Sequence, residues 1–179
     1  MAQIGSRSSR VLVFTGEGKG KTTAALGMVL RAVAHGMCVR VQQFIKRPGA
    51  SGESSALQAF PNVRITQCGC GFVPSPDHPE FPDHREAASV GFRAMAEAVS
   101  GGEWDLIVLD EICVAIHRGL VPEEAVLDLI ASLPEGRLLV LTGRGATPAL
   151  IDAADTVSRM TCVKHALASG TPAQRGVEL

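Results

Sequence analysis

The sequence predicts one α/β domain built on a parallel β-sheet with helices on both faces. Three observations support this fold class. The chain has 179 residues, of which 46% are hydrophobic and 20% are charged, which suits one domain with a substantial core. Several short runs are continuously apolar, as expected for strands that are buried on both faces. Segments of helical composition separate these runs, and this alternation is typical of parallel sheets.

The first half of the chain supplies three predicted strands and one long helix. The strands are predicted over residues 11–14, 38–45 and 63–66. A helix is predicted over 22–34, where alanine, leucine and methionine dominate, and His35-Gly36 is a typical helix end. The small residues 49–55 are expected to form a loop. The polar residues 1–10 are expected to form a flexible segment, so the predicted domain spans residues 11–179.

A long loop is predicted in the middle of the chain. Residues 68–83 contain Gly69, Gly71 and four prolines, which favours a surface loop, and loops of this length often carry function. The helices expected after it lie over 84–99, from Pro122 to about residue 133, and near 148–154. The strands expected after it lie over 106–109, 138–141 and near 157–163.

Composition narrows the classes of function and location. The formal net charge is −1, so the chain lacks the excess of basic residues expected for nucleic-acid binding. No apolar stretch is long enough to span a membrane and no signal sequence opens the chain, so we expect a cytoplasmic protein without membrane association. An odd set of five cysteines fits a reducing compartment. A zinc site at Cys68 and Cys70 with His78 and His84 is a less favoured alternative, because no second cysteine pair follows.

The clearest motif is a glycine-rich loop between the first predicted strand and the first helix. The backbone N–H groups of such a loop and the helix N-terminus form an anion site. Its lysine reaches the phosphates, and its threonine hydroxyl can ligate Mg²⁺. The motif therefore predicts a P-loop domain that binds the triphosphate of ATP, and a glycine-rich turn without a ligand is the alternative. The candidate residues are Gly16, Glu17, Gly18, Lys19, Gly20, Lys21, Thr22 and Thr23.

The glycines of this loop are out of the usual register. The Walker A pattern has a glycine five residues before Gly20, and that position here is Thr15. The first glycine, Gly16, is displaced by one residue, so the loop is expected to be tighter than the ordinary form.

Two further candidate groups follow buried strands. Asp110 and Glu111 come directly after the strand predicted over 106–109, where a P-loop protein places a carboxylate that holds Mg²⁺. The sequence leaves open which of the two ligates the ion, and an acid pair at a helix N-terminus is the alternative. Arg144 lies between glycines after the strand predicted over 138–141 and should reach phosphate bidentately. A solvated arginine in a left-handed turn is the alternative.

These motifs occur together in an order that resembles a known family, the ATP:corrinoid adenosyltransferases of cobalamin biosynthesis. The resemblance runs from about Val11 to the C-terminus. Its carriers are, in order, FTGEGKGKTTAA (14–25), RAVAHG (31–36), VQQFIK (41–46), WDLIVLDE (104–111), TGRGA (142–146), AAD (153–155), VKHA (163–166) and QRGVE (174–178).

The resemblance implies a reaction and its components. In this family, Co(I) of a reduced corrinoid attacks the 5′-carbon of ATP and triphosphate is released. ATP is understood to lie in the reverse sense along the loop, which would account for the displaced Gly16. Lys21 and Arg144 would then neutralise the leaving group, together with Mg²⁺ held by Thr22 and by Asp110 or Glu111. The resemblance also implies a reductase that supplies electrons and a homodimer.

One loop residue is implied to contact the corrinoid. Family members commonly carry Gly-Phe followed two residues later by tryptophan, and those aromatic side chains are thought to displace the lower axial ligand of cobalt. Gly71-Phe72 matches this pattern, but Pro74 stands at the tryptophan position. Whether Phe81 supplies the second aromatic side chain is open, and burial of Phe72 in the core is the alternative.

Two other classes of function compete with the adenosyltransferase. An ordinary P-loop ATPase or small-molecule kinase would release ADP, with Glu111 activating water or an acceptor hydroxyl. A non-catalytic ATP-binding module would show no turnover with reduced corrinoid. A GTPase is disfavoured because the chain contains no Asn-Lys-x-Asp motif.

Overall fold

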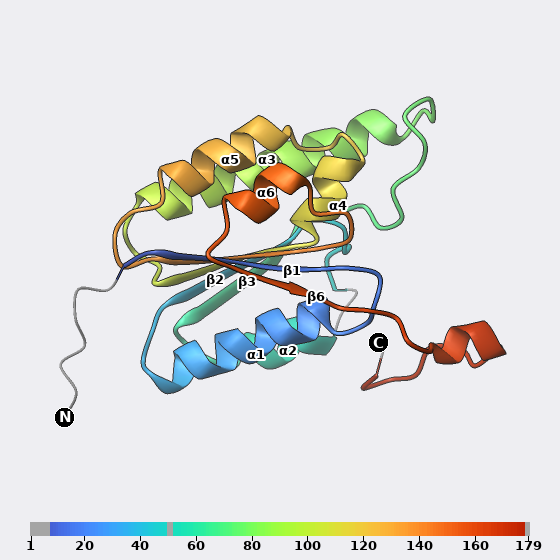
Figure 1. Ribbon diagram of the computed structural model, residues 1–179, viewed down its shortest axis with the longest axis horizontal. Helices are drawn as coiled ribbons and strands as arrows, with labels where there is room; N and C mark the ends of the chain where they lie inside the picture. The colour runs from blue at the N-terminus through green and yellow to red at the C-terminus, as the bar shows by residue number, and fades with distance from the viewer. Residues whose placement is uncertain (1–7, 50–51, 178–179) are drawn as a thin grey trace.

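A computed structural model describes residues 8–49 and 52–177, and it confirms the predicted α/β class (Figure 1). The described residues form one six-stranded parallel sheet in the order β3-β2-β4-β5-β1-β6. The strands are β1 (Arg10–Thr15), β2 (Val39–Gln43), β3 (Val63–Gln67), β4 (Leu106–Asp110), β5 (Leu138–Thr142) and β6 (Thr156–Arg159).

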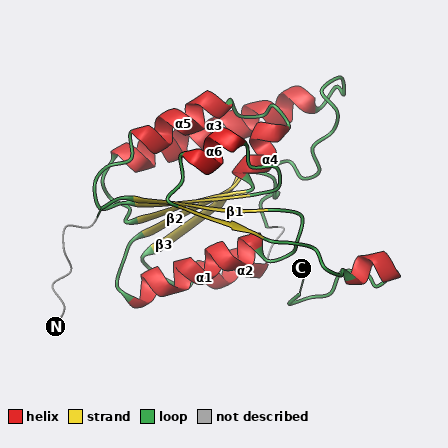
Figure 2. Ribbon diagram, in the orientation of Figure 1, coloured by secondary structure: helices red, strands yellow, loops and turns green. Residues whose placement is uncertain are grey.

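Helices cover both faces of the sheet, as predicted (Figure 2). One face carries α1 (Lys21–Ala34) and α2 (Gly52–Leu57). The other face carries α3 (Phe81–Ser100), α4 (Ile112–His117), α5 (Glu123–Ala131) and α6 (Pro148–Asp152). A short 3-10 helix, η1 (Ala166–Ser169), lies in the C-terminal segment beyond the sheet. No helix within the described part of the chain is long and apolar enough to cross a membrane.

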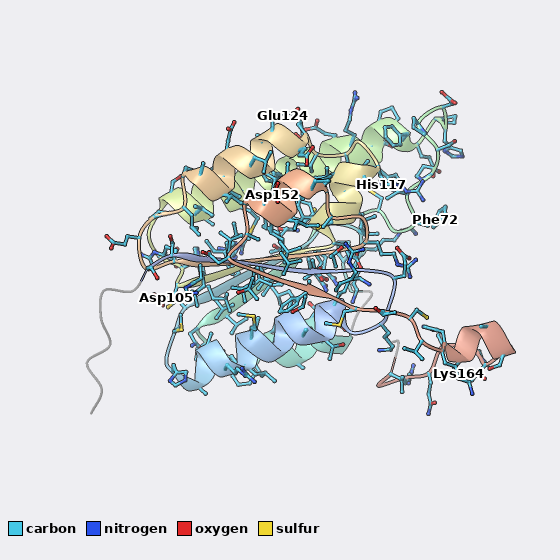
Figure 3. All side chains as sticks on the ribbon, in the orientation of Figure 1. Phe72, Asp105, His117, Glu124, Asp152 and Lys164 are labelled. Carbon is cyan, nitrogen blue, oxygen red and sulfur yellow. The ribbon has the colours of Figure 1, made fainter. Side chains whose placement is uncertain are left out.

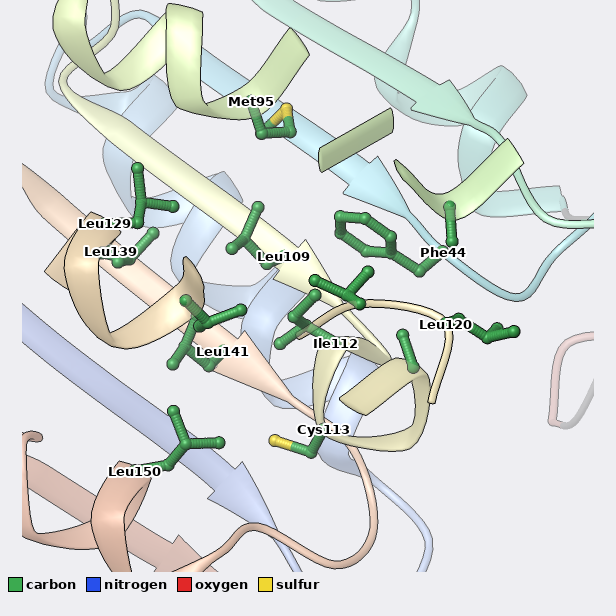
Figure 4. Packing of buried hydrophobic residues seen from close by; sticks show 14 of the residues in the cluster. Phe44, Met95, Leu109, Ile112, Cys113, Leu120, Leu129, Leu139, Leu141 and Leu150 are labelled. Atoms are coloured by element: carbon green, nitrogen blue, oxygen red, sulfur yellow. The ribbon is translucent and has the colours of Figure 1, made fainter. Parts of the chain in front are cut away.

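The continuous apolar strands supply two cores, one on each face of the sheet. Successive side chains of a strand point to opposite faces. Leu109 and Leu141 therefore pack under α3 to α6 with Met95 of α3 (Figure 4). Val108 and Val140, one residue earlier in each strand, pack on the α1 face. Burial on both faces explains why these strands show no alternation of polar and apolar residues.

The parallel pairing brings the ends of several strands to one edge. β1, β4 and β5 are in register with one another, so the residues that follow them emerge side by side. These are the glycine-rich loop after Thr15, Glu111 after β4 and Gly143 after β5. Ligands of open parallel sheets bind at this carboxyl edge.

Several predicted bounds were wrong. Residues 52–55 of the predicted loop belong to α2, because burial of Ser54 and Leu57 outweighs the low helix propensity of the glycine and serine residues. Helix α3 begins at Phe81 rather than residue 84, because Pro82 is tolerated in a first helical turn. β6 ends at Arg159, four residues before the predicted end.

Two short elements have no counterpart in the sequence prediction. Helix α4 and η1 are too short to show a helical period in the sequence. The predicted flexible segment 1–10 lies outside the described residues up to Arg7, and Arg10 already pairs with Leu138 in the sheet. Glu178 of the last family motif also lies outside the described residues.

Candidate active site

The glycine-rich loop joins β1 to α1, and Lys21 lies folded over it. Lys21 Nζ donates hydrogen bonds of 2.8 Å to the carbonyl oxygens of both Gly16 and Gly18, and the residue is only 7% exposed. Burial lowers the pKa of Lys21, and Arg144 adds to this effect, whereas the nearby carboxylate of Glu111 acts in the opposite direction. Lys21 is therefore a largely buried cation that is held over the glycine-rich loop.

The glycines of the loop are also required by a neighbouring segment. Gly18 N donates to Met160 O at 2.8 Å, just beyond the edge strand β6. A Cβ atom on Gly18 would lie 2.7 Å from the carbonyl oxygen of Thr161, and one on Gly16 would meet Met160 O even more closely. Such contacts are too short for any residue with a Cβ atom. The backbone of Met160 and Thr161, which follows β6 beside β1, therefore restricts both positions to glycine.

Asp110, at the end of β4, connects the ends of β2 and β5 and the start of α1 through one carboxylate. It is completely buried, and its Oδ1 accepts hydrogen bonds of 2.8 Å from the hydroxyls of Thr22 and Thr142. Its Oδ2 accepts a bond of 2.9 Å from Gln43 Nε2 at the end of β2. Asp110, rather than Glu111, thus contacts the P-loop threonine. Gln43 and Thr142 lie in the VQQFIK and TGRGA segments, but no role was predicted for either side chain.

Glu111 has an unusual backbone conformation. Its φ is 62°, which makes it the only non-glycine residue with positive φ in the described ranges, and its N–H donates to Thr142 Oγ1 at 2.9 Å. This conformation costs roughly 1 kcal/mol or more. Burial raises the pKa of Glu111, and Asp110 raises it further. A strained, partly buried acid with a shifted pKa at a cleft is typical of a functional site.

Replacement of Glu111 by glutamine should therefore stabilise the protein in buffer without divalent ions. A raised pKa in the folded state means that the ionised carboxylate opposes folding at neutral pH, and this penalty disappears as the group is protonated at lower pH. We expect the Tm of Glu111→Gln to exceed that of the native chain by about 2–4 °C at pH 7.5. The gain should shrink as the pH falls toward about 4.

Thermal melts with chelator at several pH values measure this effect. Glu124→Gln serves as the control. It removes the same charge from an exposed position on α5, on the face of the sheet opposite α1 and α2 (Figure 3), and should leave the Tm nearly unchanged. A lower Tm for Glu111→Gln, or a gain that does not depend on pH, would contradict the interpretation.

Arg144 lies beside the glycine-rich loop, as the TGRG turn predicts. Its Nη1 is 3.5 Å from Glu17 Oε2, and both side chains are largely exposed, so the pair itself contributes little stability. The turn is fixed by close packing: a Cβ on Gly143 would lie 3.0 Å from the backbone nitrogen of Val114 in α4. Arg144 therefore combines a fixed backbone with a solvent-accessible guanidinium group near the loop.

A cleft of about 820 Å³ opens between the glycine-rich loop, α1 and α2. Two charged residues that were not predicted, Lys46 after β2 and Glu53 of α2, form an ion pair in its wall. The C-terminal segment also reaches it through His165, Gly176 and Val177. The predicted residues in its lining are Lys19, Gly20, Lys21, Thr22, Thr23 and Glu111.

Phe72 projects from the loop that precedes α3 (Figure 3). Its side chain is 86% exposed, so the alternative of burial in the core is wrong. Phe81 is 9% exposed and belongs to the core, so it does not extend the aromatic surface of Phe72.

Burial raises the pKa of the Cys68 thiol to about 11. Among the described residues, no three His, Cys, Asp or Glu side chains are grouped so that they could hold a metal ion.

Comparisons with known proteins add a family and a fold. A family model described as ATP:corrinoid adenosyltransferase BtuR/CobO/CobP matches residues 7–179. A corrinoid adenosyltransferase of Pseudomonas aeruginosa is 40% identical over 180 residues, which cover 99% of this chain and 87% of that protein. The corrinoid adenosyltransferase CobA of Salmonella typhimurium is 36% identical over 181 residues, which cover 99% of this chain and 89% of that protein.

A solved structure supports the fold alone. The KaiC-like protein PH0186 of Pyrococcus horikoshii superimposes with a TM-score of 0.57 at 19% identity, covering 87% of this chain and 73% of that one. At this identity the likeness concerns the arrangement of strands and helices, and it agrees with the P-loop α/β architecture.

Proposed function

This chain belongs to the ATP:corrinoid adenosyltransferase family, and we propose that it transfers the 5′-deoxyadenosyl group of ATP to Co(I) of a reduced corrinoid, releasing triphosphate. Family membership supports the ATP-dependent adenosylation of corrinoids. The observation that carries the finer proposal is the cleft lined by Lys21, Thr22 and Glu111. Phe72 is exposed in the loop that follows the carboxyl end of β3.

The proposed step needs charge neutralisation rather than a base. The electron pair of Co(I) forms the cobalt–carbon bond at C5′, and the C5′–O bond breaks with its electrons going to triphosphate. No proton is removed. The chain must therefore stabilise a highly charged leaving group and align it with the attacking cobalt. Lys21, the backbone N–H groups of the loop and Arg144 are suited to the first task.

The oxygen-bearing side chains beside the loop fit Mg²⁺. This ion prefers oxygen ligands and usually takes only one or two carboxylates, with phosphates and water completing its shell. Thr22 Oγ1 and Asp110 Oδ1 lie 2.8 Å apart, and Glu111 lines the same cleft. We assign Thr22 and Asp110 or Glu111 as the residues that would hold it. Bound there, Mg²⁺ would neutralise part of the triphosphate charge.

We further propose that ATP lies in the reverse sense along the loop, with its terminal phosphate deepest and its ribose toward the corrinoid. The family resemblance and the displaced Gly16 support this orientation. It leaves the 5′-carbon accessible, whereas the ordinary orientation would present the terminal phosphate for attack.

The decisive experiment is product analysis. Incubation with MgATP and chemically reduced corrinoid under anaerobic conditions should give the adenosylated corrinoid spectrum and one triphosphate per cobalt–carbon bond. Release of ADP without an adenosylated corrinoid would refute the proposal and favour an ATPase or kinase. Nucleotide binding without turnover would indicate a binding module.

Phe72 is proposed to assist the reduction of cobalt rather than the transfer itself. An exposed aromatic side chain can occupy the lower face of the corrinoid and displace its axial ligand. Phe72→Ala should therefore reduce the rate by at least about tenfold when the reaction starts from Co(II) with a reductant, and by less than about threefold when it starts from Co(I). Val163→Ala, which shortens another highly exposed apolar side chain, serves as the control. Equal losses from the two oxidation states would argue against this role.

Three features of the cellular setting are also proposed. A reductase as electron donor and a homodimer are proposed from the family resemblance, and a cytoplasmic location is proposed from the composition of the sequence. Sedimentation of the purified chain tests the dimer, and reconstitution with candidate reductases tests the donor.

A further inference from the structure

Glu53 lines the same cleft as Lys21, but the proposed function gives it no role. From the glycine-rich loop the cleft runs along α1, past Thr23, Leu26 and Leu30, and α2 contributes Gly52, Glu53 and Ala56 to its lining. Glu53 is therefore a carboxylate in the lining of the same cavity as Lys21, carried by a different helix.

The charge of Glu53 is stabilised by its surroundings. Lys46, which follows β2, forms an ion pair with it, and the two side chains are 33% and 27% exposed for Lys46 and Glu53. Burial opposes ionisation, but hydrogen bonds from Lys46, the backbone and Gln43 outweigh it, so the pKa of Glu53 lies below its ordinary value. Glu53 is thus an ionised acceptor that is held in place yet remains accessible.

An ionised carboxylate selects the chemistry of the group beside it. It only accepts hydrogen bonds and has room for about four of them, and it repels phosphate. The neighbouring part of a bound nucleotide must therefore carry hydrogen-bond donors. Lys46 is close enough to Glu111 to influence the pKa of that residue, which places the ion pair near the phosphate end of the cleft.

We propose that Glu53 accepts hydrogen bonds from the ribose hydroxyls of ATP and that Lys46 holds it in position to do so. This inference rests on the proposed binding of ATP in the cleft. The ribose is the donor-bearing part of ATP nearest to the phosphates, and its two adjacent hydroxyls match the two oxygens of a carboxylate. Acidic residues bind ribose in the same way in dinucleotide-binding folds.

The more distant part of the cleft suits the base. Leu26 and Leu30 lie one and two helical turns beyond Thr22 on α1, and Ala56 lies about one turn beyond Glu53 on α2. These side chains offer apolar surface and no hydrogen-bonding groups, which fits a planar adenine ring. The ribose would then lie between this apolar part and the glycine-rich loop, where Glu53 orients the reacting 5′-carbon.

The test is a comparison of nucleotide affinities by calorimetry, with Mg²⁺ and without corrinoid. The native chain should bind 2′-deoxyATP or 3′-deoxyATP roughly 10- to 100-fold more weakly than ATP, the usual effect of losing a hydrogen bond to a charged group. Glu53→Ala should bind ATP more weakly by a similar factor and bind all three nucleotides within about threefold of one another. Glu53→Gln, which keeps the shape of the side chain, should show reduced discrimination and guards against misfolding of the alanine variant.

The outcomes separate this inference from the proposed function. Glu124→Gln on the opposite face of the sheet should discriminate as the native chain does. Full discrimination in both Glu53 variants, or none in the native chain, would refute the role of Glu53. Because the readout is affinity, it stays informative if the chain forms no adenosylated corrinoid, and that separate result would refute the proposed function instead.

Discussion

The Lys21→Ala variant is expected to lose corrinoid adenosylation almost completely, with kcat/KM reduced by at least about 1000-fold. Lys21 is the buried cation of the glycine-rich loop, and its Nζ already contacts the carbonyl oxygens of Gly16 and Gly18. The triphosphate gains negative charge as the C5′–O bond breaks, so a cation at this position stabilises the transition state more than bound ATP. The measurement is the initial rate of adenosylated corrinoid formation from Co(I).

Two companion variants separate charge from folding. Lys21→Met keeps most of the side-chain length without the charge and should be nearly as inactive as the alanine variant. Arg85→Ala removes an exposed cation from α3 on the other face and should keep native activity. Circular dichroism should show that all three are folded, because the two lost hydrogen bonds contribute about 1 kcal/mol each. More than a tenth of native activity in Lys21→Ala would contradict the assignment.

The Asp110→Asn variant is expected to lose both activity and stability. The Asp110 carboxylate is fully buried and accepts hydrogen bonds from Thr22, Thr142 and Gln43. An asparagine amide at this position would point its N–H donors at one of these side chains, which is itself a donor. An unsatisfied buried polar group costs about 1–3 kcal/mol, which corresponds to a Tm lower by about 3–10 °C. We expect kcat to fall by at least about 100-fold and the Mg²⁺ concentration for half-maximal rate to rise.

Thr142→Val distinguishes a structural defect from a defect in metal binding. It removes one donor to Asp110 and leaves the carboxylate intact, so it should lower the Tm without raising the Mg²⁺ requirement as strongly. The paired measurements are thermal melts and rates over a Mg²⁺ titration. An unchanged Mg²⁺ requirement in Asp110→Asn would assign the metal to Glu111 instead.

The fold was predicted most accurately where burial is strongest. The strands around Leu109 and Leu141 were predicted to within one residue, because a run buried on both faces is apolar throughout. Helix α2 was missed because Ser54 and its small neighbours favour loops, and only packing of Leu57 against the sheet makes the segment helical. The order of the strands was not predicted, since apolar runs carry no information on which neighbour they pair with.

Residues of the candidate site were likewise predicted where a local motif identifies them and missed where only the packing of distant segments brings them together. The loop around Lys21 and the residues after β4 and β5 were predicted from local motifs, and their meeting at one sheet edge followed from parallel pairing. The ion pair of Lys46 and Glu53 was not predicted, although Lys46 ends the VQQFIK segment, because a pairing between a strand end and a short helix has no sequence signature.

By itself, the sequence determined the fold class, the family and the position of the glycine-rich loop, since each depends on residues that are close along the chain. Only the tertiary structure decided that Asp110 contacts Thr22, that Phe72 is exposed and Phe81 buried, and that Glu53 lines the cleft beside the glycine-rich loop. These facts depend on strand order and on the packing of helices against a shared sheet. Such long-range contacts are selected by burial of the whole chain, and local residue patterns do not encode them individually.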